Sequence, residues 1–236
     1  AQASTYLRIE EKSPKGTIFN AILETRQCDS LLGDLVVPVY RGLSLLPSGG
    51  ISSDDEAALN SQSNRFGRLS ETLKQVKSEY DFAVIDCPPT LGVLARSALV
   101  ASNAVLLTID TSFFSLHGVG KFLELIQDVR REHAIRIFAV ATMFDSRTSF
   151  SREVLEDMRG YFKDVMLSTV IRQNVRLRES TSFGEPIFAY ARDSHGATDY
   201  KSLTDELLKK IVQGIQEMKN LVPMETRKGI GKERGV

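Results

Sequence analysis

Cysteine and net charge are both scarce in this sequence, and each shortage excludes a class of protein. Its 236 residues include two cysteines, Cys28 and Cys87, and no C-x-x-C spacing. That excludes a disulfide framework or cysteine zinc site and suits a reducing cytoplasm. The 30 basic and 30 acidic side chains cancel, so nucleic-acid binding would need a local basic patch rather than a global field. No apolar run reaches transmembrane length.

The remaining composition is that of a globular α/β protein. Hydrophobic residues make up 42% of the chain and charged residues 25%, enough for one sizeable core. We expect a single domain over residues 1–220. Residues 221–236 are rich in glycine and charge and lack core-forming side chains, so we expect a flexible polar tail.

Short apolar runs alternate with helical patterns along the chain, which predicts a doubly wound, mostly parallel sheet flanked by helices. The stripe Val119, Phe122, Leu123, Ile126 and Val129 has helical spacing, and we interpret it as core packing. Predicted strands cover 43–46, 82–85, 104–109, 137–143 and 165–171. Predicted helices cover 17–23, 52–79, 94–101, 113–131, 151–162 and 200–218.

The central stretch is 80–89, YDFAVIDCPP. Four apolar residues, 82–85, predict a strand buried on both faces. Asp86 then stands at the carboxyl end, where open α/β sheets bind ligands. In phosphate-handling folds such an acid associates with Mg²⁺ directly or through water. A solvated Asp after an ordinary buried strand is the equally simple alternative.

Several segments, in order, resemble the ParA/MinD family of deviant P-loop ATPases, and the ParA/Soj branch above all. They are DCPPTLG (86–92), ALVASN (98–103), TMFDSRT (142–148), TVIRQNVRL (169–177), SFGEPI (182–187) and SHGA (194–197). The resemblance spans roughly residues 17–210 and implies a P-loop NTPase-like fold.

The family's glycine-rich phosphate loop, with its Lys and Ser/Thr, has no match in this chain. Gly118-Val119-Gly120-Lys121 is followed by Phe122 where Ser or Thr is required, and 229–233 fails likewise. We therefore expect that the N-terminal strands and both upstream phosphate-handling motifs precede residue 1, and that the chain is a truncated form of a longer ATPase.

The resemblance also implies a function. It implies ATP and Mg²⁺ as cofactors, hydrolysis of ATP to ADP and phosphate, an ATP-dependent homodimer that binds DNA non-specifically, and a ParB-like activating partner in chromosome or plasmid partition. The expected location is the bacterial cytoplasm, in association with the nucleoid. Residues 219–236 lack an apolar face, so no membrane partner is expected. Two alternatives stay open: a DNA-binding or dimerisation module without hydrolysis, and a family ATPase that positions another cargo.

Candidate nucleotide-binding residues follow from the resemblance. It assigns Asp86 to catalysis and, through a water molecule, to Mg²⁺, and it assigns Pro88 to the loop that senses the γ-phosphate. Arg172 and Gln173 stand where the family has Pro and Arg, which leaves base selectivity open because proline would pre-set the loop. Alternatively, 142–149 is an ordinary loop in which Asp145 or Ser149 caps the next helix. The candidates that would line the base pocket are Thr142, Met143, Asp145, Arg172, Gln173 and Asn174.

Three arginines are candidates for DNA contact. The resemblance points to Arg147 and Arg176, and Arg178 lies beside the latter. A guanidinium group binds phosphate through two parallel hydrogen bonds, and such contacts give salt-dependent, sequence-independent affinity. The alternative is that all three are solvated surface charges.

Overall fold

The computed structural model describes residues 2–7, 9, 17–23, 32–48, 53–62, 64–88, 90–112 and 115–221. Pro89 and the expected polar tail after Leu221 lie outside these residues. Within them, no helix combines the length and apolar character needed to cross a bilayer.

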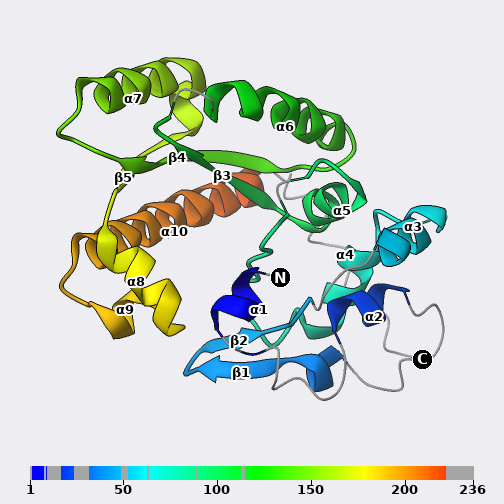
Figure 1. Cartoon of the computed structure of the whole chain (residues 1–236). Coiled ribbons are helices and arrows are strands. Elements are labelled where there is room, and N and C mark those ends of the chain that lie inside the picture. The colour runs from blue at the N-terminus through cyan, green and yellow to red at the C-terminus, as the bar shows by residue number, and fades with distance from the viewer. Residues whose placement is uncertain are drawn as a thin grey trace, which may run out of the picture.

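A three-stranded parallel sheet organises the fold, in the order β3-β4-β5. β3 (Ala104–Asp110), β4 (Arg136–Phe144) and β5 (Met166–Arg172) confirm three of the predicted strands. Figure 1 shows α6 (Ser115–Arg130) and α7 (Ser149–Phe162) on one face and α10 (His195–Leu221) on the other. Helices on both faces confirm the predicted α/β architecture.

Each face of the sheet carries its own apolar core. On one face, Ile126 of α6 and Met158 of α7 are fully buried against β3 and β4, which confirms that the helical stripe of α6 packs in the core. On the other face, Val140, Leu167 and Leu203 join β4, β5 and α10. Both faces are apolar because the strands are covered on both sides.

Two carboxylates of α10 complete the hydrogen bonding of β5. The register slips between the β4 residues Ala139 and Ala141. Near this slip the N–H groups of Ser168 and Thr169 donate to Glu206, at 2.8 and 2.9 Å. Asp199, which precedes Glu206 by seven residues in α10, accepts the N–H of Arg172 at 3.0 Å. Residues seven apart lie on one helix face, so α10 satisfies backbone groups of β5 that have no strand partner.

The other described elements are a strand hairpin and a set of mostly short helices. β1 (Val37–Tyr40) and β2 (Leu43–Leu45) form an antiparallel hairpin, of which only the second strand was predicted. The other elements are α1 (Gln2–Tyr6), α2 (Ile18–Leu23), η2 (Leu32–Leu35), α3 (Ser53–Ser61), α4 (Arg68–Leu73), η3 (Lys74–Val76), α5 (Val93–Ala101), η4 (Lys163–Val165), α8 (Val175–Phe183) and α9 (Ile187–Tyr190).

The single helix predicted over 52–79 is wrong. The structure has α3, a turn that includes Asn64–Gly67, then α4 and η3. Gly67 and Asn64 both favour turns over helix interiors. The Asn64 side chain also donates to Glu71 at 2.8 Å, which holds the turn against α4.

The buried strand predicted over 82–85 is also wrong. This segment has no strand partner among the described residues, and Phe82 and Val84 are 57% and 95% exposed. A strand is stabilised by neighbours in a sheet rather than by its own sequence. An apolar run therefore remains irregular where the described sheet offers it no adjacent strand.

Candidate functional site

The carboxyl ends of the three parallel strands bring most of the candidate residues to one edge of the sheet. Asp110 pairs with Thr142, and Phe144 pairs with Arg172, so the loops after β3, β4 and β5 begin side by side. The N–H of Gln173 donates to the carbonyl of Phe144 at 2.9 Å. Ligands bind at this edge in open α/β sheets.

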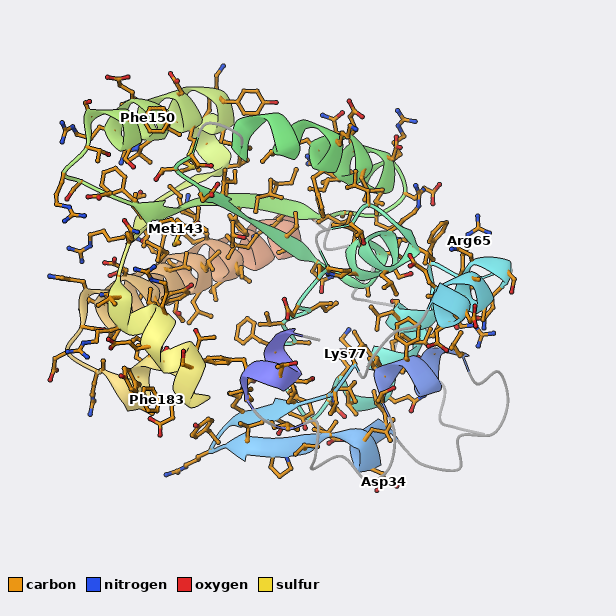
Figure 2. All side chains as sticks on the ribbon, in the orientation of Figure 1. Asp34, Arg65, Lys77, Met143, Phe150 and Phe183 are labelled. Carbon is orange, nitrogen blue, oxygen red and sulfur yellow. The ribbon has the colours of Figure 1, made fainter. Side chains whose placement is uncertain are left out.

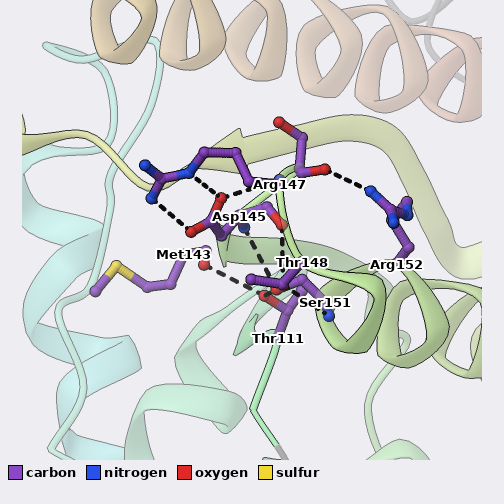
Figure 3. Close-up of polar contacts among 8 residues, drawn as sticks. Thr111, Met143, Asp145, Arg147, Thr148, Ser151 and Arg152 are labelled. Carbon is purple, nitrogen blue, oxygen red and sulfur yellow. Dashed lines mark hydrogen bonds and ion pairs between the residues drawn. The ribbon is translucent and has the colours of Figure 1, made fainter.

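The last turn of chain in β4 is held in a strained conformation at Met143 by a small polar network (Figure 3). Met143 has a φ of 55°, which is unfavourable for a side chain of its size. The Thr111 hydroxyl donates to the Met143 carbonyl at 3.3 Å and lies 3.1 Å from the Ser151 hydroxyl. Thr111 and Ser151 are both buried. Strain of this kind persists where surrounding contacts over-determine it, and here it leaves Met143 exposed at the edge.

Asp145 and Arg147 are partners of each other. The Arg147 Nε and Nη2 donate to the two Asp145 carboxylate oxygens at 2.9 and 2.7 Å. These side-chain bonds, helped by the Arg147 N–H, lower the pKa of Asp145 to about 2. Neither Asp145 nor Ser149 caps α7: the Thr148 hydroxyl accepts the Ser151 N–H at 3.2 Å.

The Asp145 carboxyl is expected to titrate near pH 2, and the substitution Arg147→Met should raise its pKa towards about 3.9, the value of an unpaired aspartate. Since the folded pKa lies below the unfolded one, the pair's contribution is present above about pH 3.9 and disappears as the pH falls through the folded pKa. ¹³C NMR of the carboxyl carbon measures both values, with Lys163→Met as the surface-charge control. Titration of the wild-type carboxyl near 3.9 would contradict the pairing.

The end of β5 is fastened to α10 by Arg172. Its Nε and Nη2 donate to Asp199 at distances down to 2.6 Å, and Asp199 is 7% exposed. The Asp199 carboxylate, with desolvation opposing it, raises the pKa of Arg172. The guanidinium that stands in place of the family's proline is therefore engaged by Asp199 of α10, while the Arg172 side chain stays partly exposed. Gln173 stays exposed at the edge.

A shallow depression lined by two arginines, a histidine and an aspartate lies beside this loop, where α8, α9 and the start of α10 meet, and we call it the basic hollow. Its volume is about 540 Å³. Asn174 caps α8 by accepting the Arg176 N–H at 2.8 Å, and Arg176 donates to Glu179 at 2.8 Å. Arg178 is exposed on the same helix and does not line the hollow. The lining residues are Asn174, Arg176, Tyr190, Ala191, Arg192, Asp193, Ser194 and His195.

Asp86 and Pro88 lie in the irregular segment before α5. The Asp86 carboxylate is exposed and accepts the N–H of Ala3 at 3.2 Å. Burial, with the nearby Asp86 charge, raises the pKa of the Cys87 thiol. Among the described residues, the Asp86 carboxylate contacts α1 rather than the loops after β4 and β5, so the structure does not bring it together with the predicted base-pocket residues.

The residues present fit the base of a nucleotide better than its phosphates and metal. The edge offers exposed side chains and loop backbone after β4 and β5. A phosphate cradle needs consecutive free N–H groups with a lysine, whereas Gly118, Gly120 and Lys121 lie inside α6. Among the described residues, no three His, Cys, Asp or Glu side chains gather as metal ligands.

Sequence reasoning missed the residues that fix these loops. Asp199 and the Thr148 cap were not predicted, nor was Arg192, which lines the hollow, although 194–197 belongs to a matching segment. The spacing of Asp199 and Glu206, seven residues apart in a helical pattern, was the available signal. Their target on β5 becomes visible only in three dimensions.

The sequence is similar to known proteins over most of its length. A family model described as "AAA domain" matches residues 1–138. Chromosome partitioning protein ParA of Myxococcus xanthus is 35% identical over 211 residues, covering 88% of this chain and 74% of that protein. Sporulation initiation inhibitor protein Soj of Bacillus subtilis is 30% identical over 208 residues, covering 87% and 81%.

Among solved structures, a cobyrinic acid a,c-diamide synthase from Mycobacterium smegmatis with bound ADP and magnesium superposes with a TM-score of 0.69. It is 27% identical, and the match covers 87% of this chain and 76% of that one. With the family model matching more than half of the 236 residues, and with two relatives at 30% identity or more, the chain belongs to the ParA/MinD family of P-loop ATPases.

Proposed function

We propose that this protein is a partition ATPase of the ParA type. In this proposal, ATP with Mg²⁺ drives formation of a homodimer that binds DNA without sequence preference, and a ParB-like partner stimulates hydrolysis and release. The protein would act on a chromosome or plasmid in the bacterial cytoplasm, at the nucleoid. The chromosome partitioning relative from Myxococcus xanthus supports the process.

The observation that carries the DNA-binding part is the basic hollow. Arg176, Arg192 and His195 come from α8, the loop after α9 and the start of α10, and they converge on one concavity. The hollow adjoins Asn174, which belongs to the loop proposed for the base. A nucleotide at the strand edge and a phosphate in the hollow would thus contact neighbouring parts of one loop.

A second candidate function is a DNA-binding module that does not hydrolyse ATP. The specific observation in its favour is the poor fit of the described residues to phosphates and Mg²⁺. The two functions differ in whether DNA binding depends on nucleotide. DNA binding that requires Mg·ATP favours the switch, and DNA binding that is indifferent to Mg·ATP favours the module.

The test is the affinity for a fluorescent duplex of mixed sequence, measured by anisotropy at several salt concentrations with and without Mg·ATP. Arg176→Met should weaken binding on the order of tenfold and make the log–log salt slope shallower by about one, since one phosphate contact is lost. Arg159→Met is the matched control, because Arg159 is an ion-paired arginine on α7.

Two results would count against the proposal. A folded wild-type protein that binds no duplex in either condition would remove the DNA-binding function. If Arg176→Met and the wild type bound the duplex with equal affinity and the same salt slope, the hollow would not be the DNA contact site. Circular dichroism of each variant confirms that the helices are intact.

A further inference from the structure

Two buried hydroxyl groups lie next to the end of β4. Thr111 follows β3, Ser151 belongs to the first turn of α7, and both are buried. Their hydroxyl oxygens lie 3.1 Å apart. The Thr111 hydroxyl also donates to the Met143 carbonyl at 3.3 Å, and the Ser151 hydroxyl accepts the Asp145 N–H at 3.4 Å. Figure 3 shows these four residues in one hydrogen-bonded group.

The chemistry of the hydroxyl groups fixes the direction of each hydrogen bond. A hydroxyl has one proton to donate. Because Thr111 gives its proton to the Met143 carbonyl, the bond between the two hydroxyls runs from Ser151 to Thr111. The network therefore starts at the N–H of residue 145, passes through both hydroxyls and ends at the carbonyl of residue 143. It joins two backbone groups of the same short stretch through the interior of the protein.

Backbone bonds from two other segments hold the same stretch. The N–H of Thr111 donates to the Thr142 carbonyl at 3.0 Å, and the N–H of Gln173 donates to the Phe144 carbonyl at 2.9 Å. Three successive carbonyls, 142–144, are thus each held from outside the stretch. This over-determination accounts for the φ of 55° at Met143, which a side chain of its size otherwise avoids.

The strained backbone presents an apolar side chain at the edge where ligands bind. Met143 is 53% exposed, and Figure 2 shows it on the side of the sheet where the chain leaves for α7 and α8. An ordinary loop has no need of strain, whereas strained residues gather at ligand sites. A thioether packs favourably on an aromatic ring, and a nucleotide base is the ring that the proposed function supplies.

We propose that Thr111 and Ser151 are positioning residues for a nucleotide base, because they hold Met143 in the strained conformation that presents its thioether to the base. Both act through Met143, since both are buried. This inference rests on the nucleotide site of the proposed function and adds how its base side is held. Because the strain exists before the ligand arrives, the base meets a pre-organised surface.

The test is competition by unlabelled ATP and CTP against a ribose-labelled fluorescent ATP analogue, with Mg²⁺, on the full chain. The triphosphate is common to both competitors, so the ratio of their affinities reports on the base. The wild type should prefer ATP, whose larger ring covers more of the thioether. Thr111→Val keeps the side-chain shape but removes the hydroxyl, and it should lower this preference about threefold or more, as expected for the loss of a thioether–ring contact.

Two further variants show whether the hydroxyl itself is responsible. Thr111→Ser keeps the hydroxyl and should keep a preference close to that of the wild type. Thr72→Val is the matched control, because Thr72 is also buried and its hydroxyl donates to a backbone carbonyl, that of Arg68, at 2.9 Å. It should leave the preference for ATP unchanged. Circular dichroism confirms that each variant is folded.

Met143→Gly separates the contact with the base from the strain. Glycine adopts a φ of 55° without steric cost, so the urea unfolding midpoint should stay near that of the wild type. The preference for ATP should nevertheless fall as far as in Thr111→Val. A purely structural role would instead lower the midpoint of Thr111→Val and leave the preference for ATP intact.

The outcomes that overturn the inference differ from those that overturn the proposed function. An unchanged preference in both Thr111→Val and Met143→Gly, with nucleotide still bound, would remove the inference alone. An equal loss of preference in Thr72→Val would also remove it, because any buried threonine would then have the same effect. A folded wild type that binds neither nucleotide would remove the ATP-dependent function together with this inference.

Discussion

Replacing Met158 by alanine is expected to lower the free energy of unfolding by about 2–5 kcal/mol, the range for large-to-small changes at buried core positions. Met158 is completely buried in the cluster formed by β3, β4, α6 and α7. The substitution removes apolar contacts and leaves a cavity that rigid neighbours on the sheet cannot fill. Urea unfolding, followed by circular dichroism, measures the change as a shift of the midpoint at constant slope.

A matched control is available on the same helix. Glu153 is exposed on α7, so Glu153→Ala should alter the unfolding free energy by no more than about 0.5 kcal/mol. If Met158→Ala were as stable as this control, α7 would not pack on the sheet as described, and the core on that face would need a different helix.

Gly196→Ala is expected to destabilise the protein by about 1–3 kcal/mol, the usual cost of overpacking. A Cβ at Gly196 would lie 2.7 Å from Leu177 Cγ and 3.0 Å from its Cδ2. The methyl group would push α8 away from α10, and Arg176, next to Leu177, would leave its position in the hollow. We therefore expect weaker duplex binding together with a lower unfolding midpoint.

Space restored at Leu177 should reverse part of this effect. Leu177→Ala alone removes partly buried apolar contacts, but combined with Gly196→Ala it removes the atoms that clash. The double variant should be more stable than the sum of the two single effects predicts, which is a coupling that a double-mutant cycle measures directly. Additive effects would show that the two residues do not meet.

The sequence predicted correctly the strands that have neighbouring strands in the described structure. β3, β4 and β5 are apolar runs, and each finds a parallel partner and a helix layer. The equally apolar run at 82–85 finds no partner and remains exposed. The local sequence shows that a segment can form a strand, but pairing with other strands determines whether the strand forms. The break in the predicted helix 52–79 depended on weaker turn signals at Asn64 and Gly67.

The candidate site was predictable in position but not in its side-chain pairing. The segments after β4 and β5 reach one edge because parallel strands end together, which sequence alone implies. The engagement of Arg147 with Asp145, and of Arg172 with Asp199, depends on which oxygens lie within reach. Arg172 is an example. It stands where the family has a proline, whose ring fixes the backbone, and Arg172 instead holds the end of β5 by bonding to Asp199 of α10.

The Glu206 carboxylate that α10 presents to β5 links strand pairing at this edge to the ionisation of one side chain. An edge strand with free N–H groups is a template on which another chain can pair, and Glu206 occupies two of those groups. Burial opposes its ionisation, yet the N–H groups of Ser168 and Thr169 and the Thr169 hydroxyl keep the pKa of Glu206 below its usual value. The protection is therefore complete at neutral pH and disappears as the pH falls through that lowered pKa. Protonation of Glu206 is therefore expected to weaken its hold on the Ser168 and Thr169 N–H groups, which become available to another strand.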